Sequence, residues 1–134
     1  MPDESELVTL AQRGDRKALN DLVSAMKDMI YNLALRMLGS PADAEDSTQE
    51  ILIRLVRNLH LRFMHAEDWE ESLWTSTHLI LLDPQNPRVH KERAFIHLQR
   101  DESGSALADL REALRLNPDP DPEIQAWLAQ LEQT

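Results

Sequence analysis

Hydrophobic residues recur at intervals of three and four along almost the whole chain, the spacing that places them on one face of an α-helix. The pattern predicts helices over about residues 4–13, 15–38, 41–65, 67–82, 87–100, 103–116 and 122–133. Ser40 followed by Pro41 is a typical helix start, because serine caps the first turn and proline tolerates its first position. Abundant Leu, Ala, Glu, Gln and Arg with little Gly favour the same all-α fold of about seven helices.

The C-terminal half contains an internal repeat. A shift of 34 residues aligns three pairs of segments, namely Ser72-Leu73 with Ala106-Leu107, Ile80 with Leu114, and Leu82-Asp83-Pro84 with Leu116-Asn117-Pro118. This shift equals the period of tetratricopeptide repeats, in which each repeat is a pair of antiparallel helices. We therefore expect helical hairpins with tetratricopeptide-like packing in this half.

The N-terminal half carries an ordered series of motifs. They are Ala11-x-x-Gly14-Asp15-x-x-Ala18-Leu19-x-x-Leu22, Arg36-Met37-Leu38-Gly39-Ser40 and Ala44-Glu45-Asp46-Ser47-Thr48-Gln49-Glu50. With these motifs, residues 5–59 resemble the first part of region 2 of extracytoplasmic-function sigma factors. In that family the last of these helices docks on bacterial RNA polymerase. The resemblance therefore implies a candidate protein-binding surface at Asp46, Gln49 and Glu50, followed along the same helix by Arg54.

The promoter-melting part of that sigma region does not follow in this chain. Where the family has a basic, aromatic-rich helix, the sequence has Trp69, Glu70 and Glu71. The net charge is −10, and nucleic-acid affinity comes largely from basic residues that neutralise phosphates. We therefore predict no nucleic-acid partner.

Residues 58–134 are similar to a different family, on another set of residues. These are Asn58-Leu59, Trp69-x-x-x-Leu73, Leu82-Asp83-Pro84-x-x-Pro87, Glu92-Arg93-Ala94, Ala106-Leu107-x-Asp109-Leu110 and Leu116-x-Pro118. They resemble the tetratricopeptide-like C-terminal tail of the SirB1 and transglutaminase-like family, although Ala94 stands where family members usually have glycine. The tail brings no active-site residue with it.

The two resemblances meet inside the helix predicted over residues 41–65. A natural fusion more often has Gly, Ser or Pro at such a boundary, and residues 55–62 contain none. Our first hypothesis is a designed or recombined helical scaffold without native biochemical activity, folded as a single domain over residues 1–134 and without a linker. Two alternatives are a sigma-related regulator that binds RNA polymerase core, and a tetratricopeptide module that binds a peptide.

The remaining side chains do not indicate catalysis or a cofactor. The chain lacks cysteine, and the acidic run at 117–123 lacks the glycine and ligand spacing of a calcium loop. The five histidines include no i, i+4 pair, so we expect them to be scattered surface or half-buried residues. We expect no enzyme, no metal and no cofactor, and we place Trp69, Trp74 and Trp127 in the core rather than in a recognition groove. With no signal sequence or membrane span recognised, we expect a soluble, cytoplasmic-type monomer.

Overall fold

The structure is a computed structural model that describes residues 16–117, 119 and 121–133. Its described part contains helices and no strand, so the all-α prediction is confirmed. The six helices of this part are α2 (Arg16–Leu38), α3 (Pro41–His65), α4 (Trp69–Leu82), α5 (Pro87–Gln99), α6 (Ser103–Leu116) and α7 (Pro122–Glu132). The helix expected over residues 4–13 lies outside the described residues.

Three of the described helices begin at a side-chain cap that precedes a proline. Ser40 Oγ accepts a hydrogen bond of 3.4 Å from the backbone N–H of Asp43 at the start of α3, which confirms the predicted cap. Asn86 accepts from the N–H of Arg88 at the start of α5 (3.1 Å). Asp121 does the same for two N–H groups of α7. These caps satisfy backbone donors that have no partner within the helix, and they fix where each helix starts.

Three of the described helices end at a residue in the left-handed conformation. Gly39 closes α2 with φ 71°, whereas the other two positions, Glu67 and Asp101, are not glycine and have φ 56° and 60°. After α3, the N–H of Asp68 donates to the carbonyl of Phe63 (3.0 Å), the hydrogen bond typical of a Schellman C-cap. Because Glu67 belongs to this cap, α4 starts at Trp69, two residues later than predicted.

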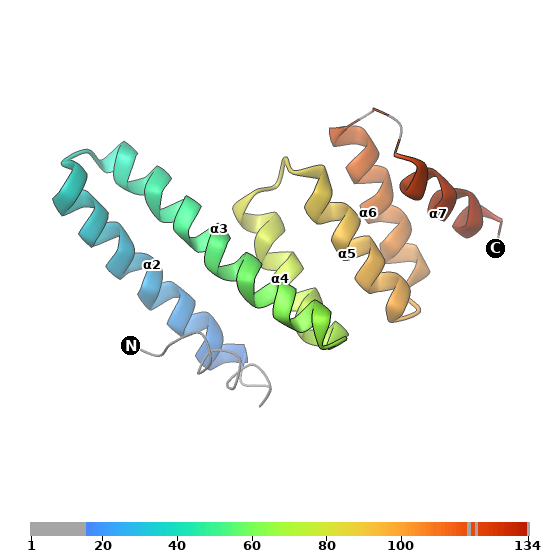
Figure 1. Ribbon diagram of the computed structural model, residues 1–134, viewed down its shortest axis with the longest axis horizontal. Helices are drawn as coiled ribbons and strands as arrows, with labels where there is room; N and C mark the ends of the chain where they lie inside the picture. Colours follow the sequence, from blue (N-terminus) through green and yellow to red (C-terminus); the bar gives the residue numbers. More distant parts are fainter. Residues whose placement is uncertain (1–15, 118, 120, 134) are drawn as a thin grey trace. The chain divides into compact units, whose positions relative to one another are not determined.

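The chain divides into two compact units, Met1–Leu59 and His60–Thr134. The boundary lies within α3, which continues through it as one unbroken helix. That residues 1–134 form one folding domain therefore stays a prediction. In the first unit, α2 and the larger part of α3 run antiparallel (Figure 1). The apolar stripe predicted for α2 is only partly covered in the described structure, since Met26 is buried while Met29, Leu33 and Met37 are exposed.

The second unit is built from antiparallel hairpins. Helix α5 packs against α4 and α6, and α6 packs against α7 (Figure 1). Helices α4 and α6 have the same length and are offset by the 34 residues of the sequence repeat. Their buried positions also correspond, in the pairs Ser72 and Ala106, Thr75 and Asp109, Ser76 and Leu110, and Leu79 and Ala113. The repeat read from the sequence is therefore also a repeat of packing.

Candidate protein-interaction sites

An aromatic surface lies where α5 approaches α7 in the second unit. The rings of Phe95 and Trp127 are 6.2 Å apart between centroids, and Trp69 meets Phe95 edge-on at 5.7 Å. Two hollows share Phe95 and Trp127 in their walls. The first, of about 400 Å³, is completed by Leu98, Gln99, Ser103, Gln130 and Leu131. The second, of about 270 Å³, is completed by Met64, Arg88, Lys91 and Glu92. We call both hollows together the Phe95–Trp127 surface.

Ion pairs hold the N-terminal end of α7 to α5 beside the aromatic pair. Lys91 Nζ donates to Asp121 (3.0 Å) and Glu123 (3.2 Å), and it lies 5.8 Å from the centroid of Trp127. Partial burial lowers the pKa of Lys91, but its hydrogen bonds with Asp121 and Glu123 outweigh this effect and raise it overall. The hydrogen bond from Lys91 holds the pKa of Asp121 below its usual value. Both groups are therefore charged at neutral pH and hold α7 against α5.

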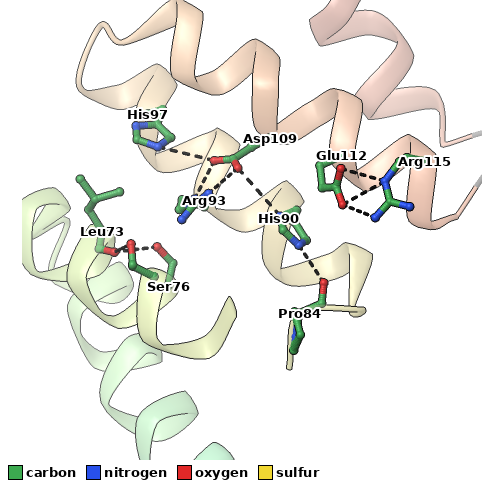
Figure 2. A network of polar contacts seen from close by, with 10 residues as sticks. Leu73, Ser76, Pro84, His90, Arg93, His97, Asp109, Glu112 and Arg115 are labelled. Atoms are coloured by element: carbon green, nitrogen blue, oxygen red, sulfur yellow. Dashed lines mark hydrogen bonds and ion pairs between the residues drawn. The ribbon is translucent and has the colours of Figure 1, made fainter. Parts of the chain in front are cut away.

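A buried carboxylate joins α5 to α6 in the second unit. Asp109, whose side chain is 7% exposed, accepts two hydrogen bonds from Arg93, of 2.8 Å and 2.7 Å (Figure 2). His97 Nε2 lies 3.5 Å from the same carboxylate, and His90 Nδ1 lies 3.9 Å from it. Figure 2 shows the three α5 side chains converging on Asp109 from successive turns. A buried charge needs such partners, so this cluster fixes the α5–α6 hairpin.

His60 of α3 contacts the position of α4 that corresponds to Asp109 in the repeat. It is 1% exposed, and its Nδ1 lies 2.7 Å from Thr75 Oγ1, the residue that the repeat aligns with Asp109. Its Nε2 lies 3.3 Å from Glu92 Oε2. The sequence predicted scattered surface or half-buried histidines, and this was wrong for His60 and His90, which are both buried. Each ring has one hydrogen-bonding partner, Thr75 Oγ1 for His60 and the carbonyl of Pro84 for His90 (3.1 Å), which offsets the cost of burying it.

The three tryptophans differ in their surroundings. Trp74 is buried, as predicted for a core residue, and its ring packs on His78. Trp69 and Trp127 are half-buried, and Trp127 lines both hollows of the Phe95–Trp127 surface. Trp127 also packs against the buried cluster of Ala94, Leu110, Ala113 and Ile124, so it lies at the margin of the core and lines the hollows as well. Its helical spacing is compatible with both settings, and in the structure it takes part in both.

The predicted protein-binding residues lie on α3. Asp46, Gln49, Glu50 and Arg54 are all accessible on this helix, and Glu50 and Arg54 form an ion pair of 3.4 Å. Positions 46, 49 and 50 share one side of the helix because its period is 3.6 residues. The structure thus presents these side chains to solvent on one helix of the first unit.

Metal-ligating residues do not gather in the described part of the chain, where no group of three or more His, Cys, Asp or Glu side chains is placed to hold an ion. None of the described helices combines the length and the apolar character that a membrane crossing requires.

Comparison with known proteins supports the two resemblances separately. Residues 22–63 match the family model of Sigma-70 region 2, and residues 59–132 match that of the tetratricopeptide repeat. The composite of two families predicted from the sequence is therefore confirmed, and the two matches overlap within α3. Neither family model describes an enzyme.

Individual relatives repeat this division. The chain is 31% identical over 94 residues to the ECF RNA polymerase sigma factor SigW of Bacillus subtilis, in an alignment covering 70% of this chain and 48% of the relative. It is 31% identical over 68 residues to a UPF0162 protein of Xylella fastidiosa, covering 51% of this chain and 24% of that protein. The chain thus spans half or less of the curated relatives' lengths.

A search of solved structures finds a partial likeness to PcrH from Pseudomonas aeruginosa. The sequences are 20% identical, the match covers 84% of this chain and 88% of that one, and the TM-score is 0.47. The family assignment rests instead on the sequence match, which takes in more than half of the chain, and on the 34-residue offset between α4 and α6. On this evidence the chain belongs to the tetratricopeptide repeat family, and it carries in front of the repeats a segment that matches Sigma-70 region 2.

Proposed function

We propose that this protein is a recombined helical interaction module that binds a peptide segment on the Phe95–Trp127 surface. The observation that carries the proposal is the pair of hollows, of about 400 and 270 Å³, that share Phe95 and Trp127. Ligand sites are typically concave and apolar, with a few polar groups at their margin. The match to the tetratricopeptide family also supports an interaction role.

The recombined origin is supported by α3. The two family matches overlap at residues 59–63, and α3 passes through this stretch without a break. Two fragments joined through a shared helix retain a continuous backbone hydrogen-bond ladder, so such a join needs no linker. A scaffold with no binding activity is the alternative to this proposal, and the binding experiment distinguishes the two.

The test is an array of immobilised peptides of varied composition, probed with the labelled full chain. We expect a subset of peptides to bind the wild-type chain and to lose most of the signal with Phe95→Ser. A matched control is Leu81→Ser, because Leu81 is 73% exposed and lines neither hollow. Circular dichroism of both variants verifies folding. Equal binding by the Phe95→Ser and wild-type chains would exclude this surface, and no binding at all would leave the inactive scaffold.

A second candidate function is binding of RNA polymerase core by α3. It is supported by the accessibility of Asp46, Gln49 and Glu50 on one side of a helix that lies within the match to Sigma-70 region 2. Glu50→Lys is expected to abolish binding to purified core polymerase. Glu70→Lys is the matched control, because it makes the same change of charge at an accessible position of α4, outside the residues that match Sigma-70 region 2. Equal loss in both variants would point to net charge rather than to a defined surface.

A further inference from the structure

The larger hollow of the Phe95–Trp127 surface has no charged residue in its wall. Leu98 and Leu131 add aliphatic surface to the two aromatic rings, and the polar part consists of Gln99, Gln130 and Ser103. Both glutamines are accessible, and an amide group offers one acceptor and two donors without a charge. Such a lining accommodates an apolar side chain and hydrogen-bonds to the neutral backbone of the segment that carries it.

The positive groups of the smaller hollow already have negative partners. Lys91 forms ion pairs with Asp121 and Glu123, and Arg88 Nε donates to Glu92 Oε1 at 3.1 Å. Counting these five side chains as ionised gives two positive and three negative charges. A carboxylate entering here would have to compete with groups that are bound in place, and it would approach a rim with excess negative charge.

From these observations, and resting on the proposed function, we infer that the ligand is an uncharged peptide segment with two apolar anchors. One anchor fills the hollow beside Leu98 and Leu131, and the other fills the hollow beside Met64. The whole chain has a net charge of −10, which further disfavours an acidic ligand at a distance. Recognition then comes from apolar burial and from the amides of Gln99 and Gln130, with little electrostatic attraction.

The experiment measures fluorescence anisotropy of labelled peptides with the full chain. Three peptides share a Ser/Gln background: one with two leucines, one with the leucines replaced by serine, and one with the leucines retained but flanked by glutamates. We expect the two-leucine peptide to bind at least about tenfold more tightly than the serine peptide, since burying a leucine side chain is favourable and two are buried together. We expect the glutamate flanks to weaken binding and added salt to change the affinity of the two-leucine peptide little.

Two substitutions on one helix localise the effect. Gln130→Glu introduces a charge into the neutral hollow, whereas Gln125→Glu makes the same change at an exposed position of α7 that lines neither hollow. We expect Gln130→Glu to weaken the two-leucine peptide several-fold and Gln125→Glu to leave its affinity unchanged. Both positions are exposed, so neither change should affect folding.

The outcomes separate this inference from the proposed function. Tighter binding of the glutamate-flanked peptide, or a steep loss of affinity with salt, would overturn the uncharged ligand while leaving a peptide-binding surface. Equal effects of Gln130→Glu and Gln125→Glu would place the ligand elsewhere and would also overturn the inference. No binding of any peptide in this experiment or in the array would refute the proposed function itself.

Discussion

Replacing Asp109 by alanine is expected to lower the free energy of unfolding of the second unit by about 3 kcal/mol. The carboxylate is 7% exposed and accepts hydrogen bonds of 2.8 and 2.7 Å from Arg93. Removing one member of a buried ion pair typically costs about 3 to 5 kcal/mol, because the other charge is left without its partner. Arg93 is 24% exposed and recovers part of its hydration, so we take the lower limit.

This loss is large relative to the total free energy of unfolding that a unit of this size can have. At about 0.05–0.15 kcal/mol per residue, residues 60–134 would have a total stability of roughly 4 to 11 kcal/mol. The assay is urea unfolding followed by tryptophan emission, which reports on the second unit alone because Trp69, Trp74 and Trp127 all belong to it. We expect the midpoint to fall while the slope with urea stays the same.

Two further variants test the reasoning. Glu112→Ala removes the partner of Arg115 in an ion pair that is 64% and 36% exposed, and it should leave the midpoint almost unchanged. The double variant Arg93→Met/Asp109→Leu should be more stable than Asp109→Ala, because apolar side chains then replace both charges. If Asp109→Ala unfolds at the same urea concentration as Glu112→Ala, the buried network does not stabilise the hairpin and the account of it is refuted.

Three other predictions concern local and global stability. Asp101 has φ 60°, a left-handed conformation that glycine adopts without strain, so Asp101→Gly should stabilise the protein by roughly 0.5 kcal/mol. Asp101→Ala should give no such gain, and the melting temperatures of the two variants test this difference. The pKa of Asp121 is lowered in the folded state, so the Lys91–Asp121 pair stabilises the protein at neutral pH and loses this effect as pH falls through the folded-state pKa. The difference in melting temperature between wild type and Lys91→Met should therefore shrink in acid, and a difference that does not change with pH would contradict this role of the pair. If residues 1–134 are one domain, far-ultraviolet circular dichroism and tryptophan emission should give coincident thermal transitions, whereas separated transitions would identify two independent units.

The helices could be predicted from the sequence because their ends depend on nearby residues. The Ser40, Asn86 and Asp121 caps each act within three residues of their own position, and each precedes a proline. The 34-residue repeat likewise predicted the alignment of α4 with α6. The start of α4 was missed because glycine is the usual signal for a left-handed cap, and Glu67 does not carry it.

The interior polar contacts could not be predicted in the same way. Arg93 and Asp109 are 16 residues apart, and their pairing depends on how α5 and α6 pack. One sequence signal was available, because the repeat aligns Asp109 with Thr75, which places a polar residue at the same position of both helices. No comparable pattern in the sequence indicates the Phe95–Trp127 surface, since a half-buried aromatic residue has the same helical spacing as an aromatic residue in the core.

The most direct test of peptide binding on the Phe95–Trp127 surface is the response of the three indole N–H resonances to the two-leucine peptide. Trp127 lines both hollows, whereas Trp74 is buried and packs on His78. The account predicts that the Trp127 resonance shifts in proportion to saturation while that of Trp74 stays in place. A bound peptide that leaves Trp127 unchanged, or that shifts only Trp74, would contradict it.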